Sequence, residues 1–216
     1  MLKQLPNALT LLRLILAPVI AWVWWVGAQP MPYQDFYENW LREAAGWRTA
    51  AAALFVIAAL TDLFDGMAAR AFNAHSKFGR LIDPIADKAL VGLPLIVIAL
   101  GMWGSSYAAW PIVAAATAVI VIRDIVMTVL RLASPDGEGA RVSSLAKVKT
   151  ALELIVIGSL FVVTAIVSQV QANDRTGSSF VPGAQVMEVV WLALLVIAAA
   201  LSAWTAFQYL TAKPRS

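Results

Sequence analysis

The sequence contains no cysteine and one histidine, His75, which leaves few of the residues that commonly bind zinc or act as nucleophiles. A chain without cysteine has no disulfide framework, no thiolate metal site and no thiol nucleophile. Charge is scarce too: 13% of the 216 residues are charged and 61% are hydrophobic, with a mean hydropathy of +0.76. Soluble domains carry roughly 25% charged residues. The composition therefore excludes an ordinary soluble domain and predicts a membrane protein.

The net charge of +3 is not gathered into a run of Lys and Arg. Nucleic-acid binding draws on clustered basic residues that neutralise phosphates. We therefore expect no nucleic-acid partner.

Long apolar stretches dominate the chain, and a helix needs about 20 apolar residues to cross a bilayer. Six stretches approach or reach that length: roughly 8–27, 48–70, 84–103, 108–130, 150–170 and 185–210. The first also loosely resembles a secretory signal peptide, but Arg13 within its apolar part favours a retained helix. The sequence predicts an all-α fold, one domain over residues 1–216, built as a polytopic bundle of six transmembrane helices.

The basic residues are distributed unevenly about these stretches. If the N-terminus faces the cytoplasm, only Arg42, Arg48 and Arg175 of the 16 Lys and Arg residues lie on the opposite side. The positive-inside rule then places both termini in the cytoplasm and the chain in the inner, cytoplasmic membrane. On the outer side, the 28–46 segment is expected to be interfacial, with Trp22, Trp24, Trp25 and Trp47 in an aromatic belt.

Four aspartates flank the connection between the second and third stretches. Asp62 and Asp65 are three residues apart, and Asp83 and Asp87 are four apart, so each pair shares a helix face. The short connection predicts that the two helices are antiparallel neighbours. All four carboxylates are then expected to converge at the cytoplasmic boundary of the membrane.

Clustered carboxylates repel unless protons or cations lie among them. Oxygen ligands without His or Cys favour Mg²⁺ or Mn²⁺, and several carboxylates permit two ions. Structural alternatives remain for individual residues. Asp83 before Pro84 is typical of a helix N-cap, and Asp87 could pair with Lys88 or Arg80.

Small residues and one arginine accompany the aspartates. Gly66, Ala69 and Gly79 either allow close helix packing or let a phosphorylated substrate approach the backbone. Arg70 is suited to binding a phosphate or to anchoring the helix at the interface. His75 is expected to be solvated and to have no chemical role.

A second basic group lies on the same predicted side. Its members are Arg123, Arg131, Arg141, Lys147 and Lys149. They are either positive-inside flanking residues or ligands for a phosphate. Arg123 lies deeper than a flanking residue needs to be, which indicates a partner such as Asp124 or an acceptor phosphate.

The pattern Asp62-x2-Asp65-Gly66-x2-Ala69-Arg70-x8-Gly79-x3-Asp83-x3-Asp87 resembles the signature of the CDP-alcohol phosphotransferase family. The resemblance implies metal-dependent transfer of a phosphatidyl or similar group from a CDP-linked donor to an alcohol, with release of CMP. It implies that Asp62, Asp65, Asp83 and Asp87 bind the metal and that Asp87 is also the catalytic base. The implied donor site comprises Asp62, Asp65, Gly66, Ala69, Arg70, Ser76 and Gly79. A homodimer is implied as well.

Secondary motifs point to a branch of the family. Leu5-Pro6-Asn7-x2-Thr10-x2-Arg13, Arg123-Asp124 with Arg131, and Lys147-Val148-Lys149-Thr150 resemble the branch that joins CDP-diacylglycerol to glycerol 3-phosphate. The second basic group would then bind the acceptor phosphate. Asp124 stands where we expect Glu, so phosphatidylglycerol, inositol phosphate or another alcohol stays open as acceptor. A cation transporter is the alternative of another class, although its acids should lie near the midplane of the bilayer.

Overall fold

The computed structural model describes residues 5–29, 37–72, 77–103, 108–133, 144–174, 181 and 183–211. Within the helices, the side chains of 5–7, 37–38, 62–72, 77–81, 131–133 and 144–147 lie outside this description. The six helices are α1 (Leu5–Gly27), α2 (Tyr37–Phe72), α3 (Lys77–Met102), α4 (Trp110–Ala133), α5 (Ser144–Asn173) and α6 (Ala184–Thr211). The described residues contain no strand, so the all-α prediction is confirmed for them.

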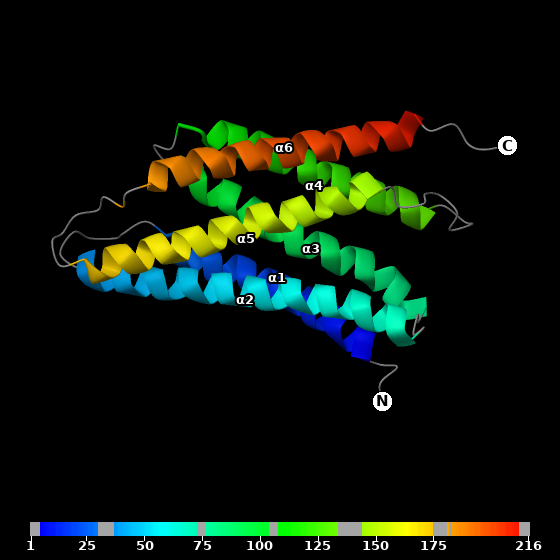
Figure 1. The fold of residues 1–216 in the computed structure, drawn as a ribbon, viewed down its shortest axis with the longest axis horizontal. Coiled ribbons are helices and arrows are strands. Elements are labelled where there is room, and N and C mark those ends of the chain that lie inside the picture. The colour runs from blue at the N-terminus through cyan, green and yellow to red at the C-terminus, as the bar shows by residue number, and fades with distance from the viewer. Residues whose placement is uncertain are drawn as a thin grey trace.

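All six helices are long and apolar enough to cross a membrane. They run roughly along one common axis, and α1 begins at the same end of the bundle at which α6 ends (Figure 1). The chain also passes from α2 to α3 and from α4 to α5 at this end, which we call the α1-start end (Figure 1). The six-span bundle predicted from hydropathy is therefore confirmed.

The second helix begins earlier than predicted. We expected a span over 48–70 preceded by an interfacial segment, whereas α2 starts at Tyr37. The reason lies in Leu41, Ala44 and Ala45, which recur at helical spacing and are buried. At 36 residues, α2 is longer than the membrane requires, with a length of about 54 Å.

The order in which the helices pack differs from expectation at one point. Over the described residues α1 packs extensively against both α2 and α3, so it lies between the two helices that we expected to be direct neighbours. The remaining contacts join α2 to α5, α3 to α4, α4 to α6 and α5 to α6, with a smaller contact between α3 and α5. Because α1 contacts both aspartate-bearing helices, its side chains can reach the candidate site.

The centre of the bundle contains an aromatic cluster. Trp24 stacks on Phe161 at a centroid distance of 4.6 Å, and Phe55 meets Phe161 edge to face at 5.3 Å. Trp24 is therefore a core residue, which corrects its assignment to the interfacial belt. Trp22 and Trp25 are exposed, as a belt requires.

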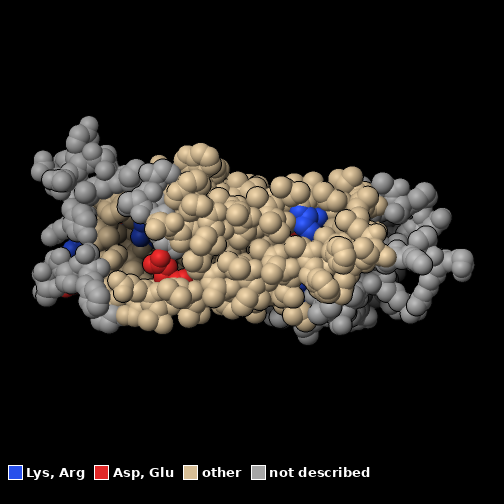
Figure 2. All heavy atoms as spheres, turned by 90° about the horizontal axis from the view of Figure 1, so that it is seen from above, with Lys and Arg blue, Asp and Glu red and all other residues tan. Residues whose placement is uncertain are grey.

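Polarity is inverted relative to a soluble protein. Figure 2 shows a face on which charged side chains form only small patches among the described atoms. Large apolar residues such as Ile15, Ile122 and Val189 are exposed instead. In contrast, four of the described charged side chains are buried inside the bundle: Arg13, Asp124, Lys149 and Glu153. Charged groups inside a membrane bundle are costly and mark functional sites, so these residues lead to the site.

Candidate active site

Two side chains of α1 contact the two aspartates of α3. The hydroxyl of Thr10 donates a hydrogen bond to Asp83 Oδ1 at 2.6 Å, and the guanidinium of buried Arg13 forms an ion pair with Asp87 Oδ1. Thr10 and Arg13 are one helical turn apart, as are Asp83 and Asp87, so the two contacts lie on one seam between the helices. The prediction that Asp83 and Asp87 share a face is confirmed.

The N-cap alternative for Asp83 is not observed, whereas the Arg80 side chain, one of the partners considered for Asp87, lies outside the described residues. α3 begins at Lys77, so Asp83 and Pro84 lie inside the helix and Asp83 is not its N-cap. Asp87 pairs with Arg13, while the neighbouring Lys88 pairs with Asp124. Both α3 carboxylates are thus oriented from α1.

The four aspartates lie on both sides of the α2–α3 connection along the chain. Asp83 and Asp87 belong to the first two turns of the Ile82–Met102 span, and Asp62 and Asp65 follow the described part of the α2 span in the sequence. The side chains of Asp62, Asp65, Gly66, Ala69, Arg70 and Gly79 lie outside the described part of the structure, as do Ser76 and His75 entirely. The convergence of four carboxylates stays a prediction.

The donor chemistry of the described pair suits a hard divalent cation. Asp83 and Asp87 present carboxylate oxygens from one helix face, without nitrogen or sulfur ligands between them, as Mg²⁺ and Mn²⁺ prefer. The described side chains alone include no group of three or more His, Cys, Asp or Glu residues that could hold a metal ion. The contribution of Asp62 and Asp65 of α2 to a metal site stays a prediction.

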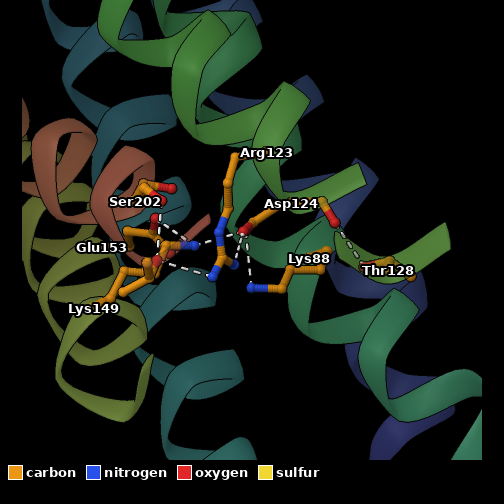
Figure 3. Close-up of polar contacts among 8 residues, drawn as sticks. Lys88, Arg123, Asp124, Thr128, Lys149, Glu153 and Ser202 are labelled. Atoms are coloured by element: carbon orange, nitrogen blue, oxygen red, sulfur yellow. Dashed lines mark hydrogen bonds and ion pairs between the residues drawn. The ribbon is translucent and has the colours of Figure 1, made fainter. Parts of the chain in front are cut away.

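A second polar group lies between α3, α4, α5 and α6. Its centre is Asp124 of α4, which is buried and contacts three cations (Figure 3). Lys88 Nζ of α3 lies 2.9 Å from Asp124 Oδ2, while Arg123 Nη1 and Lys149 Nζ lie 2.8 and 2.5 Å from Oδ1. One carboxylate thus joins three helices, and we call this group the Asp124 cluster.

Two further residues complete the Asp124 cluster. Glu153, one turn after Lys149 on α5, forms an ion pair with it at 2.8 Å, and both side chains are buried. Arg123 Nη2 donates to Thr205 Oγ1 of α6 at 3.0 Å, and this hydroxyl donates in turn to the Ser202 carbonyl at 2.9 Å. The cluster thereby includes residues of α6.

The structure brings together part of the predicted acceptor site. Arg123 and Lys149 meet at Asp124, one of the two partners considered for Arg123, and the other, an acceptor phosphate, stays a prediction. The side chains of Arg131 and Lys147, and all of Arg141, lie outside the described residues. Their part in an acceptor site stays a prediction.

Sequence reasoning missed several members of the two groups. Lys88, Glu153 and Thr205 were assigned no role in binding, although the spacing of Lys149 and Glu153 is that of a helical ion pair. Thr10 and Arg13 were noted only as part of a motif. Their contacts with α3 span more than 70 positions, and no local pattern reveals such a pairing.

The two groups adjoin through α3. Asp87 points to α1 while the next residue, Lys88, points to Asp124 on α4. α3 therefore connects a carboxylate group to a basic one, an arrangement suited to a metal-bound donor beside an anionic acceptor.

Comparison with known proteins decides the family. The family model described as CDP-alcohol phosphatidyltransferase matches residues 3–208, nearly the whole chain. The chain belongs to this family. Membership makes the protein a transferase, in agreement with the aspartate signature and against the transporter interpretation.

Three relatives of this CDP-alcohol phosphatidyltransferase are named CDP-diacylglycerol–glycerol-3-phosphate 3-phosphatidyltransferase. The protein of Cereibacter sphaeroides is 35% identical over 164 residues, which cover 76% of this chain and 65% of that relative. The protein of Shigella flexneri serotype 5b is 30% identical over 212 residues, 97% of this chain and 94% of the relative. The protein of Escherichia coli strain K12 is 29% identical over the same share of both chains.

Proposed function

We propose that this CDP-alcohol phosphatidyltransferase transfers the phosphatidyl group of CDP-diacylglycerol to glycerol 3-phosphate. The products are phosphatidylglycerophosphate and CMP, so the enzyme is a phosphatidylglycerophosphate synthase of phospholipid biosynthesis. The observation that carries the proposal is the name shared by relatives that match 97% of the chain. The basic Asp124 cluster beside the carboxylates of α3 supports an acceptor that carries a phosphate.

The reaction is a displacement at phosphorus. The hydroxyl oxygen of glycerol 3-phosphate forms a bond to the phosphorus that carries the diacylglycerol. The bond between this phosphorus and the bridging oxygen breaks, and CMP leaves with the electron pair. Asp87 accepts the proton of the attacking hydroxyl, and its ion pair with Arg13 orients the carboxylate for this role.

Asp62, Asp65, Asp83 and Asp87 would hold two Mg²⁺ or Mn²⁺ ions. When bound, these ions supply positive charge for the pyrophosphate of the donor and for the departing CMP. Thr10 fixes one oxygen of Asp83 and so limits the rotation of that carboxylate. Gly66, Ala69, Arg70, Ser76 and Gly79 complete the proposed donor site along the α2–α3 connection.

The acceptor phosphate would bind the second basic group, which comprises Arg123, Arg131, Arg141, Lys147 and Lys149. Arg123 and Lys149 already meet at one point of the bundle interior. A phosphate needs several donors in a fixed arrangement, and guanidinium and ammonium groups provide them. Lys88 adds a further cation from α3.

The α1-start end of the bundle is proposed to face the cytoplasm. There the acyl chains of CDP-diacylglycerol would stay in the bilayer while its head group meets the aspartates at the membrane boundary. The asymmetry of Lys and Arg supports this orientation, and the homodimer implied by the family stays a prediction.

The test is CMP release by the purified protein in detergent with CDP-diacylglycerol and Mg²⁺ or Mn²⁺. We expect release with glycerol 3-phosphate and not with phosphatidylglycerol, inositol phosphate or serine. A chelator should abolish it, and added metal should restore it. Release with another acceptor alone would contradict the proposed substrate, and release that withstands the chelator would contradict the metal role.

A further inference from the structure

Asp124 is the shared partner of three cationic side chains from three helices (Figure 3). It is buried, and the part of the structure described here offers those cations only one other carboxylate, Glu153, which contacts Lys149. Lys88 of α3 and Arg123 of α4 both point toward Asp124 (Figure 3). The relative positions of these two cations therefore depend on this carboxylate.

The charges of the Asp124 cluster do not balance. Lys88, Arg123 and Lys149 carry three positive charges, and Asp124 and Glu153 carry two negative ones. An excess of one positive charge inside a membrane bundle is unfavourable unless an anion approaches it. Lys149 is 1% exposed, whereas Lys88 and Arg123 are 26% and 12% exposed, so an anion reaches the latter pair more readily.

We propose that Asp124 is a positioning residue for the acceptor: it holds Lys88 and Arg123 at the separation in which they bind the phosphate of the acceptor. This inference rests on the proposed function. It adds Lys88 as a ligand of the acceptor phosphate. Lys149 instead supports Asp124, because it is buried and pairs with the carboxylates of both Asp124 and Glu153. Asp124 itself does not contact the reacting atoms.

A carboxylate that only neutralises charge would behave in the opposite way. Its removal would raise the net positive charge of the cluster and strengthen the binding of a phosphate. Removal of a positioning carboxylate releases Lys88 and Arg123, which then repel each other and lose their common geometry. The direction of the change in acceptor affinity therefore separates the two roles.

Thr205 allows an independent test of whether the position of the Arg123 guanidinium matters for acceptor binding. It accepts a hydrogen bond from Arg123 Nη2 and donates one to the Ser202 carbonyl, so its hydroxyl fixes the guanidinium from α6. Thr205→Val removes this hydroxyl with almost no change of shape. Thr117→Val is a matched control, because Thr117 is also buried, lies two turns before Asp124 on α4, and has no hydrogen-bond partner among the described residues.

The experiment measures kcat and KM for both substrates by CMP release in detergent. For Asp124→Asn we expect the KM for glycerol 3-phosphate to rise at least about tenfold, with the KM for CDP-diacylglycerol changed by less than about twofold. Asp124→Glu should recover part of the loss, since it restores the charge. Thr205→Val should raise the acceptor KM by about two- to fivefold, and Thr117→Val should leave it unchanged.

Two outcomes overturn the inference while leaving the proposed function intact. One is a wild-type enzyme that uses glycerol 3-phosphate and an Asp124→Asn variant whose acceptor KM is unchanged or lower. The other outcome applies if Asp124→Asn loses its helical circular-dichroism signal and is therefore unfolded. In that case the inference is overturned if Thr205→Val, like Thr117→Val, leaves the KM for glycerol 3-phosphate unchanged. Failure of the wild-type protein to release CMP with glycerol 3-phosphate would instead contradict the proposed function.

Discussion

Arg13 links α1 directly to the carboxylate that we propose as the base. Its side chain is buried and paired with Asp87, whose own side chain is 40% exposed. The Asp87 carboxylate is therefore accessible to a substrate while the buried Arg13 guanidinium fixes its orientation. An arginine inside a membrane helix is expensive, and a role in orienting a reacting group accounts for its presence.

Replacing Arg13 tests this role at the residue scale. Arg13→Met keeps the length of the side chain and removes the charge that orients Asp87. We expect kcat to fall about ten- to a hundredfold, because a partly buried carboxylate loses the cation that orients it. The KM for glycerol 3-phosphate should change much less, and Arg13→Lys should restore part of kcat. CMP release under saturating substrates measures both.

Arg42→Met is the matched control, because Arg42 is exposed and lies near the start of α2, far along the helix from the aspartates. We expect its kcat to equal that of the unmodified enzyme. An Arg13→Met variant with wild-type kcat would contradict the orienting role, whatever the control does.

Single residues divide into those a sequence can assign and those it cannot. The shared face of Asp83 and Asp87 follows from their spacing along one helix, and the structure confirms it. The depth of Arg123 suggested a partner, and Asp124, one of the two considered, forms an ion pair with it. Thr10, Arg13 and Lys88 acquire partners on other helices. Such partners depend on which helices are neighbours, and spacing along one helix carries no information about that.

At the scale of elements, α1 and α2 approach closely at the end opposite the α1-start end. A Cβ added to Gly27 would lie 2.9 Å from Trp47 Cβ and 3.3 Å from the backbone nitrogen of Arg48. Arg48 also donates to the Gly27 carbonyl at 3.1 Å and to Ser168 Oγ at 2.7 Å, which ties α1, α2 and α5 together. The absence of a side chain at Gly27 permits this junction.

Gly27→Ala should therefore weaken the packing of α1 on α2. We expect the free energy of unfolding to fall by about 1–3 kcal/mol, because Trp47 Cβ and a backbone atom are in the way and neither can move independently of α2. Titration of the detergent-solubilised protein with SDS, followed by circular dichroism, measures the change. Gly46→Ala is the control, since nothing lies within 4 Å of its added Cβ.

Gly46→Ala should be neutral or raise stability by up to about 1 kcal/mol, because alanine favours the helix. Equal stability of Gly27→Ala and Gly46→Ala would show that the α1–α2 junction tolerates a methyl group, against the packing described here.

Hydropathy predicted the number of helices but not how they pack. Apolar length identifies a span, and all six were found. The start of α2 was missed because two charged residues, Arg42 and Glu43, lower the hydropathy of this segment. They lie between the buried residues Leu41 and Ala44. The position of α1 between α2 and α3 was missed because membrane helices associate through shape and polar contacts, which hydropathy does not measure.

At the scale of the whole molecule, the two ends of the bundle differ in chemistry. The described aspartates of α3 lie near the α1-start end, where the chain passes from α2 to α3 (Figure 1). Trp22, Trp25 and Trp47 lie toward the other end, near the ends of α1 and the start of α2. This polarity supports an enzyme that works at one membrane surface, and the surface in question can be determined directly.

The chain lacks cysteine, so a single introduced cysteine reports the orientation without background. Gln29 and Thr211 are exposed: Gln29 follows the end of α1 and Thr211 is the last residue of α6, at the opposite end of the bundle. In spheroplasts of a bacterial host, a membrane-impermeant maleimide should label Gln29→Cys directly and Thr211→Cys only after lysis. CMP release by each variant controls for folding. The reverse labelling pattern would place the aspartates outside the cytoplasm and contradict the proposed orientation.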